Sequence, residues 1–266
     1  MIEPAAALEF AVQAAQRAGR VAMKHYGSHA APSQKPDGTW VTEADVAVEA
    51  QLRLLIARSW SGHNVLGEEE GLSAAGGGAA IPGAPTWILD PIDGTHNYMN
   101  GIPIWGILIG LREEDRFTIG VCHAPALGET YEAALGLGAR MNGARIEARS
   151  VASLAEATTL YGSIESFSGA GQALLDSLVE KSWRTRGLGD FWGHMLVARG
   201  AADVMVEAEL NLWDVAALVP IVTEAGARIT RLDGEPVGDT GSCLTAGPGV
   251  HEQVVALARE TGMSAF

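Results

Sequence analysis

The sequence predicts an α/β protein in which β-sheets and α-helices stack in layers. Strands are grouped between residue 87 and about residue 148, and strands alternate with helices after about residue 150. The composition, 47% hydrophobic and 19% charged, allows the 266 residues to bury a sizeable core. We expect one domain over residues 1–266, with an α+β part at about 1–150 and an α/β part at about 151–266, because no linker separates them.

The first part begins with two helices and a flexible segment. The elements expected before residue 86 are, in order, an amphipathic helix at 5–26, a loop at 29–40, a helix at 42–59, a strand at 65–66 and a surface loop at 71–85. Gly27 ends the first helix because glycine readily leaves the helical conformation. The segment 71–85 consists mainly of Gly, Ala and Pro, so we expect it to be the least structured part of the chain.

Strands dominate from residue 87 onward. They are expected at 87–90, 105–111, 116–124, 129–135 and 144–148. Asn142-Gly143 is a strong hairpin signal before the last of these strands. The elements expected after residue 150 are a helix at 169–180, a strand at 182–187, a helix at 191–200, a strand at 203–207, a helix at 213–225, strands at 227–231 and 243–246, and a helix from about 250.

The charge balance restricts the possible partners. A formal net charge of −14 argues against binding to nucleic acid or to an anionic membrane. It would also repel a phosphorylated substrate unless cations intervene. The chain lacks a basic signal-peptide start and a run of about 18 apolar residues, so we expect a cytoplasmic protein. Cys122 and Cys243 lie in apolar settings, and we expect both thiols to be free in a reducing compartment.

Carboxylates recur where an apolar strand ends or a helix begins. They are Glu68, the pair Asp90 and Asp93, and Asp214. If these chain segments converge, the four carboxylates raise one another's pKa unless cations bind between them. Oxygen ligands without a nearby Cys or His cluster favour Mg²⁺ over zinc.

Gly94 and Thr95 follow the acidic pair and suggest a phosphate site. Glycine permits close approach of the backbone, and N–H groups at a helix start bind phosphate oxygens. An isolated Asp-Gly is usually only a turn, so the interpretation depends on several motifs together. A calcium-binding EF-hand loop from Asp90 is excluded, because its sixth position is Thr95 and its twelfth is Gly101.

Two further patterns are best interpreted as structural. Gly136-Leu137-Gly138 resembles the start of a dinucleotide-binding fingerprint, but the third glycine is missing and a hairpin signal follows. His25 and His29 are four residues apart, with Gly27 between them and no further ligand in sight. We therefore expect neither a nucleotide cofactor nor a zinc site from them.

The acidic motifs together resemble the inositol monophosphatase superfamily of Mg²⁺-dependent, typically lithium-sensitive phosphomonoesterases. Its signature Asp-Pro-Ile/Leu-Asp-Gly-Thr matches residues 90–95, and its signature Trp-Asp-x-Ala matches residues 213–216. Residues 41–45, 67–69 and 136–146 are also similar to family patterns, so the likeness covers nearly the whole chain. The resemblance implies a layered αβαβα sandwich, usually a homodimer.

The resemblance also implies roles for matching positions, with two or three Mg²⁺ ions per site. The implied metal ligands are Glu68, Asp90, the Ile92 carbonyl, Asp93 and Asp214. The implied catalytic residues are Asp45, Glu68 and Thr95, of which Asp45 and Thr95 would polarise the attacking water. The implied substrate-binding residues are Gly94 and Thr95 for phosphate, and Asp190 and Glu207 for the leaving group.

Three stretches are similar to the histidinol-phosphate phosphatase branch of the superfamily: residues 103–105, 189–191 and 218–220. Carboxylates at Asp190 and Glu207 would pair with the ammonium group and the protonated imidazole of histidinol phosphate. Two alternatives stay open at this point: Asp190 caps the helix that starts at Phe191, and Phe191 and Trp192 belong to the core rather than stacking on an imidazole.

The sequence therefore predicts a Mg²⁺-dependent phosphatase that hydrolyses histidinol phosphate. The alternative enzyme is an inositol-1-phosphate phosphatase or a phosphatase of many small metabolites. A non-enzymatic alternative is a phospho-ligand-binding protein on the same scaffold. The presence of Thr95 beside the four carboxylates favours an enzyme, because a binding protein does not need a residue that activates water.

Overall fold

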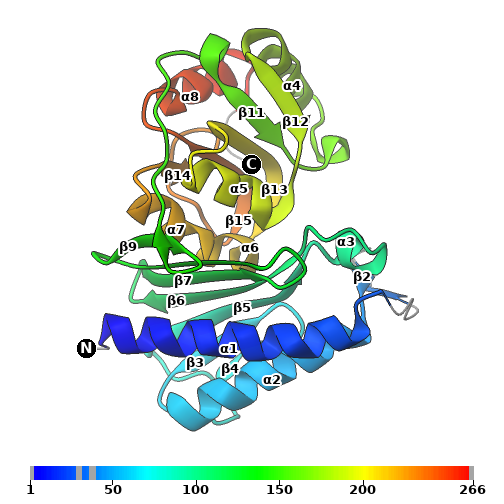
Figure 1. Cartoon of the computed structure of the whole chain (residues 1–266), viewed down its shortest axis with the longest axis vertical. Coiled ribbons are helices and arrows are strands. Elements are labelled where there is room, and N and C mark those ends of the chain that lie inside the picture. The colour runs from blue at the N-terminus through cyan, green and yellow to red at the C-terminus, as the bar shows by residue number, and fades with distance from the viewer. Residues whose placement is uncertain (1–2, 28–31, 36–39, 264–266) are drawn as a thin grey trace.

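The computed structural model describes residues 3–27, 32–35 and 40–263. Five layers of helices and sheets stack along its long axis (Figure 1). In order, the layers are the helices α1 (Pro4–His25) and α2 (Glu43–Ser59), an eight-stranded sheet, the helices α5 (Asp190–Ala198), α6 (Leu212–Ala216) and α7 (Leu218–Glu224), a five-stranded sheet, and the helices α4 (Ala170–Lys181) and α8 (His251–Glu260). The predicted αβαβα sandwich is confirmed.

The two sheets come from different parts of the chain. The eight-stranded sheet has the spatial order β10 (Ala144–Arg145), β9 (Gly138–Met141), β8 (Glu129–Ala134), β7 (Arg116–Ala124), β6 (Gly106–Glu113), β5 (Thr86–Asp93), β3 (Asn64–Gly67), β4 (Gly71–Ala74). The five-stranded sheet has the order β12 (Arg184–Gly187), β11 (Thr158–Tyr161), β13 (Val204–Asn211), β15 (Thr240–Ala246), β14 (Arg228–Thr230). Among the described residues, β3 and β5 are the only neighbouring strands of the larger sheet that run parallel, so these two strands end at the same edge.

Helices α1 and α2 cover the outer face of the larger sheet. Their bounds differ from the predicted ranges 5–26 and 42–59 by at most one residue. Helix α1 buries a face made almost entirely of alanine, which lets it lie close to the sheet. Helix α2 starts with a capping box, in which Thr42 accepts from the helix backbone and Asp45 accepts from the Thr42 N–H group. The start of α2 therefore fixes the backbone that carries Asp45.

The helix predicted at 213–225 is two helices with a break at Ala217. Pro220 lacks an N–H group, and its ring is incompatible with a regular helical carbonyl at Ala216, four residues earlier. Glycine lets this break pack on the larger sheet. A Cβ at Gly110 would lie 2.8 Å from Ala216, and one at Gly120 would collide with the Ala217 carbonyl.

Other expectations need correction or extension. The segment 71–85 is not wholly a loop, because its first four residues form β4, antiparallel to β3. Strand β11 was not predicted, and β13 extends four residues beyond its predicted end at residue 207. The hairpin at Asn142-Gly143 is confirmed, with φ angles of 50° and 78°. The remaining short elements are β1 (Ser33–Gln34), β2 (Trp40–Val41), α3 (Thr95–Met99), and the 3₁₀ turns Leu154–Glu156 and Ile164–Ser166.

Several smaller expectations are resolved as well. Cys122 and Cys243 are buried free thiols. The turn at Gly136-Leu137-Gly138 is structural, because its Gly136 and Gly138 N–H groups bind the Glu224 carboxylate at 2.8 and 2.7 Å. Within the described ranges, no helix is both long enough and apolar enough to cross a membrane. His29 lies outside the described residues.

Candidate active site

Three of the predicted carboxylates meet at one point. Asp90 and Asp93 lie in the C-terminal half of strand β5, and Asp214 lies in the first turn of α6. Each offers an oxygen, and these oxygens all lie within 4.8 Å of one another. In a regular strand, residues three apart point to opposite faces, but the β5–β6 register shifts between Asp90 and Asp93. Pro91 stands at this irregularity, where a ladder hydrogen bond is not needed.

A backbone N–H group holds one oxygen of each carboxylate. Ile92 N donates to Asp90 at 3.0 Å, Phe191 N donates to Asp93 at 2.7 Å, and Asn211 N donates to Asp214 at 2.7 Å. These bonds orient the three side chains before any ligand binds. One oxygen of each carboxylate lies within 4.8 Å of the others, close enough for a shared cation.

The fourth carboxylate, Glu68, follows β3 beside the end of β5. It is outside the trio of Asp90, Asp93 and Asp214 but interacts electrostatically with it. Lys35 Nζ donates to Glu68 at 2.8 Å and to Glu69 at 2.7 Å. Burial raises the pKa of Glu68 to about 7, although Lys35 acts in the opposite direction. Lys35 was not predicted, because a single lysine in a Pro- and Gly-rich segment carries no motif.

Burial and the repulsion between like charges disfavour simultaneous ionisation of all three carboxyl groups of the trio. Burial first, and the neighbouring carboxylates second, hold the pKa values of Asp90 and Asp93 well above their usual range. Burial also raises the pKa of Asp214 to about 6, against hydrogen bonds from Asn211 and Asp90. A divalent cation would remove this repulsion, so the trio fits a metal bound through oxygen.

This electrostatic strain predicts a pH dependence for the metal-free protein. The folded-state pKa values of Asp214 and Glu68 are raised above the unfolded values of about 4. Their contribution to stability is therefore greatest below about pH 4 and is lost as the pH rises through about 6 to 7. With a chelator present, we expect the midpoint temperature of unfolding to fall between pH 5 and pH 8. Excess Mg²⁺ should reverse the fall, and a higher midpoint at pH 8 in chelator would contradict the expectation.

Thr95 and Asp45 lie beside the trio. Thr95 Oγ1 lies 3.0 Å from the Ile92 carbonyl oxygen and 3.4 Å from Asp45 Oδ1. The other oxygen of Asp45 binds Thr42. Gly94 has a φ of 80°, and a Cβ there would lie 3.0 Å from the Ile104 carbonyl oxygen, so glycine suits this turn.

A cavity of about 170 Å³ adjoins the trio, and three more carboxylates line it: Asp190, Glu207 and Glu209. Glu207 is 7% exposed and accepts from Asp190 N at 3.2 Å. Burial first, then the charge of Asp190, raises the pKa of Glu207 to about 8. The structure thus places both predicted leaving-group residues in one wall beside the candidate metal site.

The capping alternative for Asp190 is wrong. Helix α5 begins at Asp190 itself, with Gly189 before it, and Asp190 has a φ of 56°. Its side chain accepts from Asn97 Nδ2 at 2.8 Å instead of capping the helix. Phe191 is buried in the core and also lines the cavity, whereas Trp192 donates to Glu129 at 2.9 Å.

His194 also lines this cavity and was not predicted as a site residue. It follows Asp190 by four residues on α5, so both lie on one helix face. His194 Nδ1 lies 2.8 Å from Thr245 Oγ1, and Nε2 has no hydrogen-bond partner among the described residues. Burial lowers the pKa of His194 to about 3, so its ring is neutral. Only its spacing from Asp190 could have drawn attention to it.

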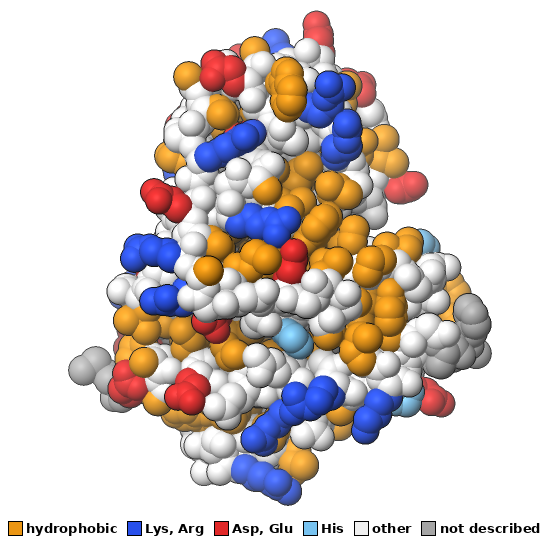
Figure 2. Space-filling model, viewed as in Figure 1, with side chains coloured by type: hydrophobic (Ala, Val, Ile, Leu, Met, Phe, Trp, Pro, Cys, Tyr) orange, Lys and Arg blue, Asp and Glu red, His pale blue; other side chains and the backbone are white. Residues whose placement is uncertain are grey.

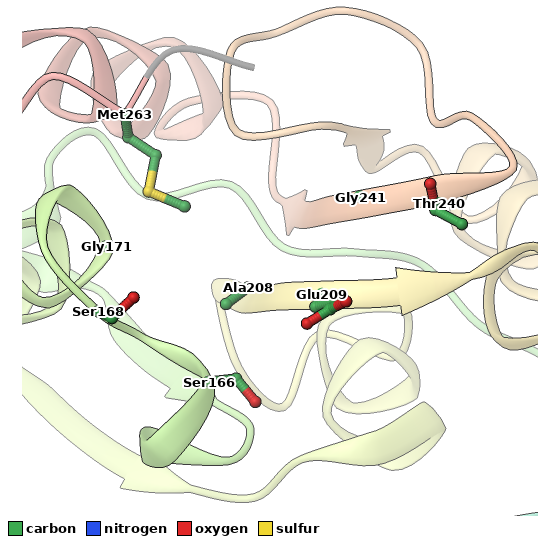
Figure 3. A pocket seen from close by; sticks show the side chains of 8 residues that line it. All are labelled: Ser166, Ser168, Gly171, Ala208, Glu209, Thr240, Gly241 and Met263. Atoms are coloured by element: carbon green, nitrogen blue, oxygen red, sulfur yellow. The ribbon is translucent and has the colours of Figure 1, made fainter. Parts of the chain in front are cut away.

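A second cavity, of about 360 Å³, lies next to the first and shares Ser166 and Glu209 with it. Figure 3 shows it between strands β13 and β15 and the start of α4, with Met263 on the far wall. It opens where the β13–β15 ladder shifts between Glu207 and Leu210. The cavity lined by Asp190 and Glu207 therefore continues through the second cavity toward the surface of the C-terminal layers.

Fold and site together define an α/β sandwich protein with a buried carboxylate site suited to divalent cations. The chain belongs to the inositol monophosphatase family, whose model matches residues 3–263. It is 41% identical over 227 residues to a histidinol-phosphatase of Mycobacterium tuberculosis, covering 83% of this chain and 85% of the relative. It is 38% identical to a histidinol-phosphatase of Streptomyces coelicolor, covering 83% and 84%. An IMPase structure from Thermotoga maritima superposes with a TM-score of 0.85 at 30% identity, covering 96% and 98%.

Proposed function

We propose that this protein is a Mg²⁺-dependent phosphatase that hydrolyses histidinol phosphate to histidinol and inorganic phosphate. The observation that supports it best is the position of the acidic trio beside a cavity walled by Asp190 and Glu207. The trio suits metal and phosphate, and the wall suits a cationic leaving group. The similarity to histidinol-phosphatases adds support for this substrate.

Mg²⁺ fits the donor set, because all the proposed ligands are oxygens and three of them are close together. Glu68, Asp90 and the Ile92 carbonyl would hold one ion, and Asp90, Asp93 and Asp214 a second. A third, weaker position would face Glu68. When bound, Mg²⁺ neutralises phosphoryl oxygens, acidifies the attacking water and stabilises the leaving oxygen.

The chain itself would orient the phosphate and the water. The N–H groups of Gly94 and Thr95, at the turn before α3, would bind the phosphate oxygens. The Thr95 hydroxyl would accept the proton of the attacking water while passing its own proton toward Asp45 Oδ1. Burial raises the pKa of Asp45, which makes this carboxylate a better proton acceptor. Glu68, as a metal ligand, would help to position the same water through the ion that it holds.

Two carboxylates in the leaving-group wall favour histidinol phosphate over inositol-1-phosphate. Asp190 and Glu207 would form charge-assisted hydrogen bonds with an ammonium and an imidazolium group. Burial raises the pKa of Glu207 to about 8, but a cation bound beside it would favour the ionised form of the carboxyl group. A neutral polyol would not gain from such an ion pair. The second candidate, a broad or inositol-type phosphatase, is favoured by 32% identity to a fructose-1,6-bisphosphatase/inositol-1-monophosphatase of Thermotoga maritima, over 95% of this chain.

A substrate panel tests the proposal. Phosphate release is measured from histidinol phosphate, inositol-1-phosphate, fructose-1,6-bisphosphate and a nucleoside monophosphate, with Mg²⁺ and with a chelator. We expect kcat/KM to be highest for histidinol phosphate, by at least about 10-fold, because one buried charge pair gained contributes this much or more. The chelator should abolish release. Equal rates on all substrates would contradict the histidinol phosphate assignment, and no release at all would favour a phospho-ligand-binding protein.

We propose further that the chain acts as one domain in a cytoplasmic homodimer that takes part in histidine biosynthesis. The sandwich supports one domain, since α6 from the second part packs on β5 and β6 of the first. Figure 2 shows apolar side chains gathered across the middle of one face, which suits contact with a second copy. The charge of −14 gives no reason to expect nucleic acid or an anionic membrane as a partner.

A further inference from the structure

We propose that Glu49 and Arg53 form a clamp on helix α2 that positions Glu68 for metal binding. The clamp lies outside the acidic cluster and carries no sequence motif of its own. Its function rests on the proposed role of Glu68 as a metal ligand. Glu49 and Arg53 are positioning residues, because they act on the backbone around Glu68 and not on the substrate.

The carboxylate of Glu49 binds the backbone of the two residues that follow Glu68. It is fully buried, and its oxygens accept from Glu69 N at 2.8 Å and from Glu70 N at 3.0 Å. Arg53 Nε donates to the same carboxylate at 2.8 Å. These bonds fix the two peptide units that directly follow the Glu68 side chain.

The residues before and after this turn complete the clamp. A Cβ at Gly67 would collide with the Glu49 carboxylate, so only glycine allows so close an approach. Arg53 also donates to the Gly71 carbonyl at 2.6 Å and to Ser73 Oγ at 3.0 Å. The turn between β3 and β4 is thus held along its whole length by one buried ion pair.

Helix α2 links this turn to the proposed water-activating residue. Asp45 and Glu49 are four residues apart and therefore lie on the same face of the helix. Asp45 reaches Thr95, while Glu49 reaches the turn at Glu68. One rigid element therefore sets the position of the metal-ligand turn relative to the start of α3. Groups that orient metal ligands affect metal affinity about 10- to 100-fold when they are removed.

The variant Glu49→Gln tests the clamp. Glutamine keeps the size of the side chain, but its amide cannot accept from all three donors. We expect the Mg²⁺ concentration for half-maximal activity to rise by about 10- to 100-fold. The KM for histidinol phosphate at saturating Mg²⁺ should stay within about twofold, since the substrate does not contact the clamp. Without substrate, the Mg²⁺-induced rise in the unfolding midpoint should shrink at each Mg²⁺ concentration.

The matched control is Asp203→Asn. Asp203 is also fully buried and pairs with Arg149, in the C-terminal part of the chain away from the acidic trio. The Asp203→Asn variant should have a lower unfolding midpoint than the wild type but an unchanged Mg²⁺ requirement. Equal Mg²⁺ requirements in Glu49→Gln and Asp203→Asn would overturn the clamp.

Arg53→Lys is a second test of the clamp, to be used if Glu49→Gln does not fold. Lysine keeps the charge but loses the bonds to Gly71 and Ser73, so the Mg²⁺ requirement should still rise several-fold, about 3-fold or more. A wild-type Mg²⁺ requirement in this variant would overturn the clamp as well. A wild-type protein that responds to Mg²⁺ in neither activity nor midpoint would instead contradict the proposed function, and the clamp with it.

Discussion

Asp90→Asn should lower Mg²⁺-dependent phosphate release by at least about 100-fold while the protein still folds. Asp90 is the proposed ligand common to both metals, and asparagine removes its charge and one of its two equivalent oxygens. The side-chain carbonyl of asparagine can still accept from Ile92 N, so the bend of β5 should persist. The measurement is kcat/KM at saturating Mg²⁺ together with the unfolding midpoint.

The unfolding midpoint separates lost chemistry from lost structure in Asp90→Asn. Burial and the neighbouring carboxylates disfavour the Asp90 anion in the metal-free protein, as its raised pKa indicates. In a chelator near neutral pH, the variant should therefore be at least as stable as the wild type. Asp176→Asn, an exposed change on α4, is the control and should retain full activity. Activity above about one tenth of wild type in Asp90→Asn would contradict its role as a bridging ligand.

Asp190→Asn should raise the KM for histidinol phosphate by about 30-fold or more and leave the KM for a neutral phosphomonoester within about threefold. Losing one partner of a buried charge pair costs roughly 2 to 5 kcal/mol. Asparagine can still accept from Asn97, so the start of α5 should keep its geometry. The measurement compares KM for histidinol phosphate and inositol-1-phosphate in wild type and variant.

Glu207→Gln provides an independent change in the same wall and should show the same selectivity. His194→Gln is the matched control, because His194 also lines the cavity but is neutral in the wild type. This variant should change the KM for the two substrates to a similar extent. If Asp190→Asn weakened both substrates equally, Asp190 would act by orienting the chain and not by pairing with a cation.

The sequence predicted at which strand ends and helix starts the carboxylates lie, but not the backbone geometry that brings them together. The apolar strands and their terminal acids were visible, because strand ends and helix starts carry local signals. The convergence of Asp90 and Asp93 depends on a bulge, and Pro91 is its only local sign. Asp45 was expected from a family pattern, whereas its position depends on the capping box with Thr42.

The errors arose where distant residues decide the local structure. The Gly- and Ala-rich residues 71–74 have weak strand preference, but β3 and Arg53 hold them as a strand. The break at Ala217 follows from Pro220 and from the glycines of the sheet beneath it. Lys35 and Glu49 were missed because their partners in the turn at Glu68 and Glu69 lie 20 or more residues away in the chain. Such contacts leave no pattern in a single sequence.

We propose that carboxylate oxygens from separate segments of the chain form one site for divalent cations. Crystals grown with Mn²⁺ in place of Mg²⁺, measured at the manganese absorption edge, test it most directly. We expect anomalous peaks at about 2.0 to 2.6 Å from carboxylate oxygens of Asp90, Asp93 and Asp214, with at least one peak also close to Glu68. A well-diffracting crystal with no peak inside this trio, or with peaks only at other acidic residues, would contradict the claim.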